Sequence, residues 1–82
     1  MTEQAIQHIV AEQRFVLQVE NTSAVLEYRR NGSEIDFCHT FVPPECRGKG
    51  LAEKLVRHGL AWAKDKQLNI RASCWYVQKF LR

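Results

Sequence analysis

Residues 39–52 read HTFVPPECRGKGLA, and this stretch decides the fold. An apolar strand should end at Pro43-Pro44, because neither proline can donate a hydrogen bond to a neighbouring strand. A short loop with two glycines, Gly48 and Gly50, follows and leads directly into an amphipathic segment. Where a helix starts after such a loop, its first backbone N–H groups are unpaired and are suited to binding phosphate groups. We therefore interpret residues 47–52 as a pyrophosphate-binding loop.

Two cations, Arg47 and Lys49, alternate with the glycines and would attract an anionic ligand. The loop lacks the Gly-x-x-x-x-Gly-Lys-Ser/Thr pattern of a Walker loop and the three glycines of a dinucleotide fingerprint. The alternative interpretation is a tight turn in which both cations are merely solvated. We favour phosphate binding because a hydrophobic strand precedes the loop and an amphipathic helix follows it.

A β-hairpin is predicted around Asn31-Gly32, a dipeptide suited to a two-residue type I′ turn. That turn fixes the register of the two strands and places the apolar partners on one face of the sheet. The predicted facing pairs are Tyr28 with Ile35, Leu26 with Phe37, and Ala24 with His39.

The remaining segments complete a small α/β unit. Arg14–Val19 alternates as a strand, whereas residues 1–12 fit either a helix or a strand. A helix is predicted from Leu51 to Lys66, a strand over Leu68–Ser73 and a short helix at the C-terminus. Because the connection runs through a helix, the last strand should lie parallel to the hairpin strand. We predict one α/β domain over residues 1–82, with a mixed, mostly antiparallel sheet, a central helix after the phosphate-binding loop and a short C-terminal helix.

Length and charge narrow the function classes. The chain has 82 residues and a formal net charge of +3, with −3 on residues 1–40 and +6 on residues 41–82. No apolar run approaches the ~20 residues of a membrane-spanning helix. Three cysteines without paired spacing favour free thiols in a reducing compartment and exclude a C-x₂₋₄-C metal site. We expect a cytoplasmic protein with an anionic partner, without metal or membrane span, and its small size leaves a homodimer open.

Three motifs, in this order along the chain, together resemble a known family. His39-Thr40-Phe41-Val42-Pro43 comes first, Arg47-Gly48-Lys49-Gly50-Leu51-Ala52 fits the signature Gln/Arg-x-x-Gly-x-Gly/Ala, and Cys74-x-Tyr76-Val77 follows later. Over residues 9–82 the chain resembles the GNAT superfamily of acetyl-CoA-dependent N-acetyltransferases, in particular its minimal, single-domain YjdJ-type subgroup.

The resemblance implies that the chain binds acetyl-CoA, releases CoA and acetylates an amine. It implies that backbone groups of Phe41 and Val42 hold the pantetheine arm and that the N–H groups of residues 47–52 surround the pyrophosphate. Arg47 and Lys49 would add long-range attraction for the phosphates. The subgroup lacks the elements that usually form the acceptor pocket, so the acceptor, whether polyamine, peptide or small amine, is not identified.

His39 and Cys74 are the candidate reactive pair, since each ends a predicted strand and the crossover can place those strands side by side. A histidine with a pKa near ~6.5 could deprotonate an incoming amine. A cysteine of lowered pKa could take the acetyl group covalently. The alternatives are a hydrogen-bonded core histidine on the apolar face of the hairpin and a small buried cysteine.

The leading hypothesis is an N-acetyltransferase that acts directly or through Cys74. The alternative is a non-catalytic module that binds CoA or acyl-CoA, which the missing acceptor-pocket elements would suit. Nucleic-acid binding by the basic half is the weakest hypothesis, because Trp62 and Phe80 are better explained as core residues.

Overall fold

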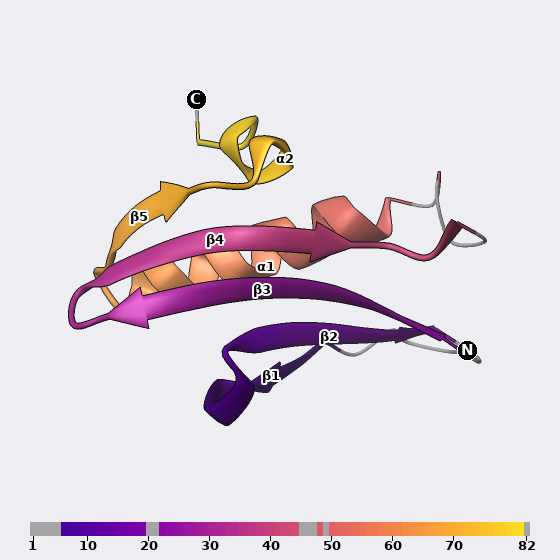
Figure 1. The fold of residues 1–82 in the computed structure, drawn as a ribbon, viewed down its shortest axis with the longest axis horizontal. Coiled ribbons are helices and arrows are strands. Elements are labelled where there is room, and N and C mark those ends of the chain that lie inside the picture. Colours follow the sequence, from indigo (N-terminus) through magenta and orange to yellow (C-terminus); the bar gives the residue numbers. More distant parts are fainter. Residues whose placement is uncertain (1–5, 20–21, 45–47, 49, 82) are drawn as a thin grey trace.

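Five strands form one sheet in which each strand lies beside the next one in the chain (Figure 1). The computed structural model describes residues 6–19, 22–44, 48 and 50–81. The first four strands are antiparallel, and the last pair is parallel. In chain order, the elements are β1 (Ile6–Ile9), a 3₁₀ turn (Val10–Glu12), β2 (Arg14–Val19), β3 (Thr22–Asn31), β4 (Glu34–Phe41), α1 (Leu51–Asp65), β5 (Asn69–Ala72) and α2 (Trp75–Gln78).

This arrangement confirms the predicted α/β fold, its mixed sheet and both helices. The segment that the sequence left open between helix and strand forms β1 and the 3₁₀ turn, and β1 pairs antiparallel with β2. Residues 1–5 lie outside the described part of the chain.

Helix α1 covers one face of the sheet, and the core lies between the two layers (Figure 1). Phe15 and Leu17 of β2 alternate toward the helix and are fully buried, as are Leu26 of β3 and Phe37 of β4. Burying each such side chain contributes about 1.5–3 kcal/mol of hydrophobic free energy. The helix supplies the matching apolar stripe: Leu51, Leu55, Val56, Gly59, Leu60 and Ala63.

The hairpin forms, but its predicted register is wrong. The two turn residues are Gly32 and Ser33, because Asn31 stays in β3 and pairs with Glu34. Gly32 has φ of 61°, and Ser33 is not among the residues with positive φ, which fits a type II′ turn instead of type I′. Because the turn lies one residue later than predicted, each residue of β3 near the turn faces a β4 residue two positions after the predicted partner. A shift of two keeps the same side chains facing the core. Tyr28 therefore faces Phe37 where Ile35 was predicted.

A β-bulge in β4 changes the register a second time. Tyr28 pairs with Phe37 but Glu27 pairs with His39, so Cys38 is the extra residue on β4. Beyond the bulge, Thr40 lies opposite Leu26 on the face that packs against α1. His39 therefore lies on the opposite face and is exposed, which corrects the expectation that it continues the apolar face.

Candidate functional site

Strands β4 and β5 separate near their carboxyl ends and leave a cavity between them. β5 pairs with residues 34–37 of β4, so residues 38–41 extend without a strand partner on that side, within the described part of the chain. Helix α2 begins beyond β5 and turns away from β4 (Figure 1). The resulting cavity has a volume of about 400 Å³ and is lined by Thr40, Phe41, Val42, Ala52, Cys74, Trp75 and Tyr76.

The Cys74 thiol lies on this cavity and is hydrogen-bonded to a neighbouring hydroxyl. Its Sγ is 3.6 Å from Oγ1 of Thr40, and its backbone N–H donates to the carbonyl oxygen of Phe37 at 3.1 Å. Burial by itself raises the pKa of the Cys74 thiol, but hydrogen bonds from the Val77 backbone, the Thr40 hydroxyl and the Tyr76 backbone bring that pKa below its ordinary value. Because the thiolate is the nucleophilic form, this environment favours reaction at Cys74.

Helix α1, which follows the glycine loop in the chain, reaches the same cavity at its start through Ala52. Gly48 and Gly50 have φ of 84° and 72°, and a Cβ added at either would meet no atom of the described, non-adjacent residues within 4 Å. Gly50 is the N-cap of α1 and has no side chain that could cap the helix. The first-turn N–H groups of a helix have no partner within the helix, and the helix dipole favours an anion beside them. Leu51 is buried, so only its backbone can take part, whereas Ala52 lines the cavity; Arg47 and Lys49 lie outside the described residues.

The structure does not bring His39 to Cys74. The bulge turns His39 to the sheet face opposite α1, where it pairs with Glu27, and the side chain that meets the Cys74 thiol is Thr40. Thr40 was missed because the sequence carries no signal for the bulge, and an unbroken alternation would have placed it on the outer face. The catalytic role of His39 stays a prediction, restricted to a substrate that approaches from its own face.

Two aromatic residues of α2 also line the cavity. Tyr76 is half-buried, and burial together with the nearby Glu53 carboxylate raises the pKa of its phenol, which is therefore protonated at neutral pH. Trp75 is 71% exposed, and Nζ of Lys79 lies 5.4 Å from the Trp75 ring centroid and 5.0 Å from that of Tyr76. The cavity therefore combines an apolar rim with a thiol, a hydroxyl and a neutral phenol.

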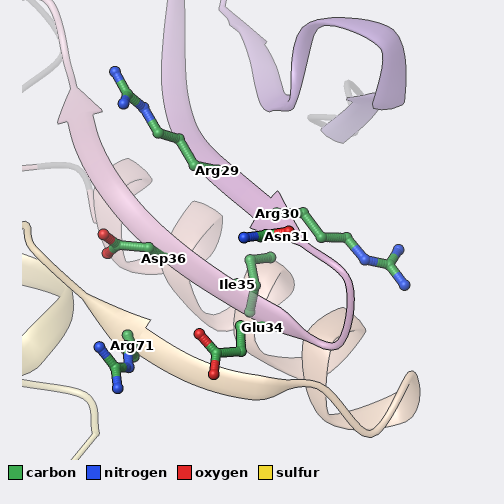
Figure 2. A pocket seen from close by; sticks show the side chains of 7 residues that line it. All are labelled: Arg29, Arg30, Asn31, Glu34, Ile35, Asp36 and Arg71. Atoms are coloured by element: carbon green, nitrogen blue, oxygen red, sulfur yellow. The ribbon is translucent and has the colours of Figure 1, made fainter.

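A second cavity of about 160 Å³ lies at the hairpin end of β3, β4 and β5. Figure 2 shows Arg29 and Arg71 on either side of Asp36, with Glu34 close to Arg71. Positive and negative side chains alternate there, so the cavity has no clear preference for an anion or a cation.

Searching the described residues finds no group of three or more His, Cys, Asp or Glu side chains that could hold a metal ion. Among the helices that the structure describes, none has the length and apolar character needed to cross a membrane.

Comparisons with known proteins agree with this geometry. Residues 14–82 match the family described as GCN5-related N-acetyl-transferase. Protein NATD1 of Bos taurus is 32% identical over 80 residues, covering 94% of this chain and 71% of the relative. Protein NATD1 of Homo sapiens is 31% identical over 80 residues, with the same shares. The NMR solution structure of a GCN5-like protein from Staphylococcus aureus has a TM-score of 0.75 and 31% identity, covering 99% of this chain and 80% of that one.

Proposed function

The chain belongs to the GCN5-related N-acetyltransferase family, and on that basis we propose that it transfers the acetyl group of acetyl-CoA to an amine. One observation carries the proposal: a single cavity links the separated end of β4 and the Cys74 thiol to the start of α1. A thioester and a pyrophosphate joined by a pantetheine arm need binding sites of these two kinds, arranged along one groove.

Different parts of the groove would bind different parts of acetyl-CoA. Backbone groups of Phe41 and Val42 hold the pantetheine arm, since β4 continues there beyond its pairing with β5. The N–H groups of Gly48, Gly50, Leu51 and Ala52 bind the pyrophosphate, and the side chains of Arg47 and Lys49 attract it from a distance.

The cavity offers two routes for transfer. In the direct route, the amine nitrogen bonds to the thioester carbonyl carbon, the C–S bond breaks, and CoA leaves as a thiolate that the neutral Tyr76 phenol can protonate. The proton that the amine loses passes to water, and the Tyr76 phenolate regains a proton from water. In the covalent route, the Cys74 thiolate attacks that carbonyl carbon and displaces the CoA thiolate. The amine nitrogen then bonds to the acetyl carbon, the bond to Sγ breaks and restores the Cys74 thiolate, and the proton that the amine loses passes through water to the CoA thiolate. His39 could accept the amine proton only from the sheet face opposite α1.

Calorimetric titration with acetyl-CoA tests the binding part of the proposal. Gly50→Glu fills the open space at the helix start and adds negative charge, so we expect at least a ~10-fold loss of affinity. Gly32→Glu is a matched control, because Gly32 also has positive φ and open space but lies in the hairpin turn. The loop assignment is wrong if folded Gly50→Glu binds acetyl-CoA as tightly as Gly32→Glu does.

Intact-mass analysis after mixing with acetyl-CoA distinguishes the two routes. The covalent route predicts the mass of one added acetyl group, present in Cys38→Ala and absent in Cys74→Ala. If no acetyl group is trapped and Cys74→Ala still releases CoA when an amine is added, transfer is direct. If acetyl-CoA binds but no amine from a broad panel releases CoA, the chain is a binding module.

A further inference from the structure

The Asp36 carboxylate of β4 is hydrogen-bonded to the turn between β5 and α2. Oδ1 of Asp36 accepts the backbone N–H of Ser73 at 2.8 Å, and Oδ2 accepts the Ser73 hydroxyl at 2.7 Å. The next residue, Cys74, donates its N–H to the carbonyl oxygen of Phe37 at 3.1 Å. Two successive residues of the turn are thus joined to two successive residues of β4.

These bonds lie where the strands part. Phe37 and Ala72 form the last pair of the parallel ladder, and Ser73 is the first residue beyond it. The direction in which the chain leaves β5 decides where Cys74 Sγ lies relative to Thr40 Oγ1, which is 3.6 Å away. A further hydrogen bond near this turn runs from Nε2 of Gln78 to the Ala72 carbonyl oxygen at 2.8 Å, and it joins α2 to β5 instead of to β4.

Asp36 makes these bonds although two arginines flank it. Arg29 pairs with Asp36 across β3 and β4, and Arg71 pairs with it across β4 and β5. Figure 2 shows one arginine on each side of the carboxylate. Neither forms an ion pair with Asp36 among the described residues, and both carboxylate oxygens are directed to Ser73.

We propose that Asp36 is a positioning residue for the Cys74 thiol, which it holds against Thr40 through its paired hydrogen bonds to Ser73. Asp36 does not line the cavity, so it acts through the turn and not on a substrate. Its effect on acetyl transfer rests on the proposed function, but its effect on the thiol does not.

Alkylation of Cys74 by iodoacetamide across pH, followed by peptide mass mapping, measures this effect, with Cys38 as an internal reference. Asp36→Ala frees the turn and weakens the Thr40 contact, so we expect Cys74 to react about 3- to 10-fold more slowly near pH 7, with its pH midpoint raised. Asp36→Asn keeps an oxygen for the Ser73 N–H and an amide for its hydroxyl, so it should restore most of the rate.

Whether Cys74 alkylation becomes slower or faster distinguishes positioning by Asp36 from a simple effect of its charge. A carboxylate near a thiol disfavours the thiolate, so removing its charge would accelerate alkylation in both Asp36→Ala and Asp36→Asn. Acceleration in both variants overturns the proposal, as does equal slowing in both.

Two further variants keep the test sharp if Asp36→Ala folds poorly. Ser73→Ala loses only the hydroxyl bond and should slow Cys74 alkylation in the same direction by a smaller factor, whereas Ser73→Thr should not. Glu34 lies on the same strand, and its side chain makes no hydrogen bond to the other described residues, so Glu34→Ala should leave the rate unchanged. Equal slowing in Glu34→Ala and Asp36→Ala contradicts a specific role for Asp36.

Titration of each variant with acetyl-CoA separates this inference from the proposed function. If Asp36→Ala slows alkylation while the wild-type chain fails to bind acetyl-CoA, the positioning role stands and the transferase proposal fails. If acetyl-CoA binds and Asp36→Ala leaves Cys74 reactivity unchanged, the positioning role fails alone.

Discussion

Gly59 lies on the buried face of helix α1, where the helix packs closely against the sheet. A Cβ at this position would lie 2.8 Å from Cδ2 of Leu26, 3.1 Å from Cε1 of Phe37 and 3.4 Å from Cε2 of Phe15. All three neighbours are fully buried, so they have little room to move. At the present distance between the two layers, position 59 therefore has no room for a side chain.

Gly59→Ala should consequently destabilise the protein. A change from glycine to alanine inside a helix normally stabilises by about 1 kcal/mol, whereas overpacking a core costs about 1–3 kcal/mol. We expect the free energy of unfolding, measured with urea, to fall by about 1 kcal/mol. Ala61→Gly at an exposed position of the same helix is the control and should cost about 1 kcal/mol by helix propensity alone. A more stable Gly59→Ala protein would contradict the close contact.

The His8 side chain adds contacts to the backbone pairing that joins β1 to β2. Its Nε2 lies 2.6 Å from the Tyr28 hydroxyl, and its ring stacks on Phe15 with a centroid distance of 4.0 Å. The Trp62 ring of α1 meets it edge-on at 4.6 Å. Burial lowers the pKa of His8, and the nearby His58 lowers it further. The folded protein therefore favours the neutral imidazole.

This pKa shift predicts that acid weakens the attachment of β1. The unfolded chain takes up a proton at His8 near a pKa of about 6.5, before the folded protein does, so this contribution to stability is complete above that pH and declines as the pH falls below it. Hydrogen exchange should show faster opening of β1 at about pH 5.5 than at about pH 7.5. His8→Gln, which keeps a hydrogen-bonding side chain without titrating, should reduce this difference. His39→Gln, at an exposed position, should leave it; equal loss in both variants would exclude His8 as the cause.

The elements were more predictable than their registers. Helix α1 and the hairpin follow from apolar periodicity and a glycine turn, which are local properties of the sequence. The turn lies one residue later than predicted because glycine can take positive φ at either central position. Between the turn and the bulge, each strand residue therefore faces a partner two positions from the predicted one, and a shift by an even number leaves every side chain there on its predicted face of the sheet. The bulge at Cys38 has no local signal, and it decided that Thr40 and not His39 meets Cys74. The link between Asp36 and Ser73 depends on the β4–β5 register and joins residues 37 positions apart, which no local pattern contains.

At the scale of the molecule, the candidate site and the contacts that His8 makes with Tyr28, Phe15 and Trp62 belong to opposite ends of the fold. The start of α1 and the end of β4 lie at one end of the sheet, and the hairpin turn and the 3₁₀ turn lie at the other (Figure 1). Helix α1 runs between them along the core. Substitutions around His8 should therefore alter stability without a direct effect on acetyl-CoA binding.

The charge distribution bears on how a substrate reaches the site. Residues 41–82 carry a net charge of +6 against −3 for residues 1–40, and the cations of the glycine loop belong to the basic half. Electrostatic attraction to phosphates acts over about 10 Å at ~0.1 M salt and is screened above that concentration. We therefore expect the affinity for acetyl-CoA to fall several-fold between ~0.05 and ~0.5 M salt, and the affinity for acetyl-pantetheine, which has no phosphates, to be weaker and nearly independent of salt. Lys49→Gln should reduce the salt dependence, whereas Lys66→Gln, at the other end of α1, should not. Salt-independent binding of acetyl-CoA would mean that the basic half does not serve the phosphates, and its charge would then need a different partner.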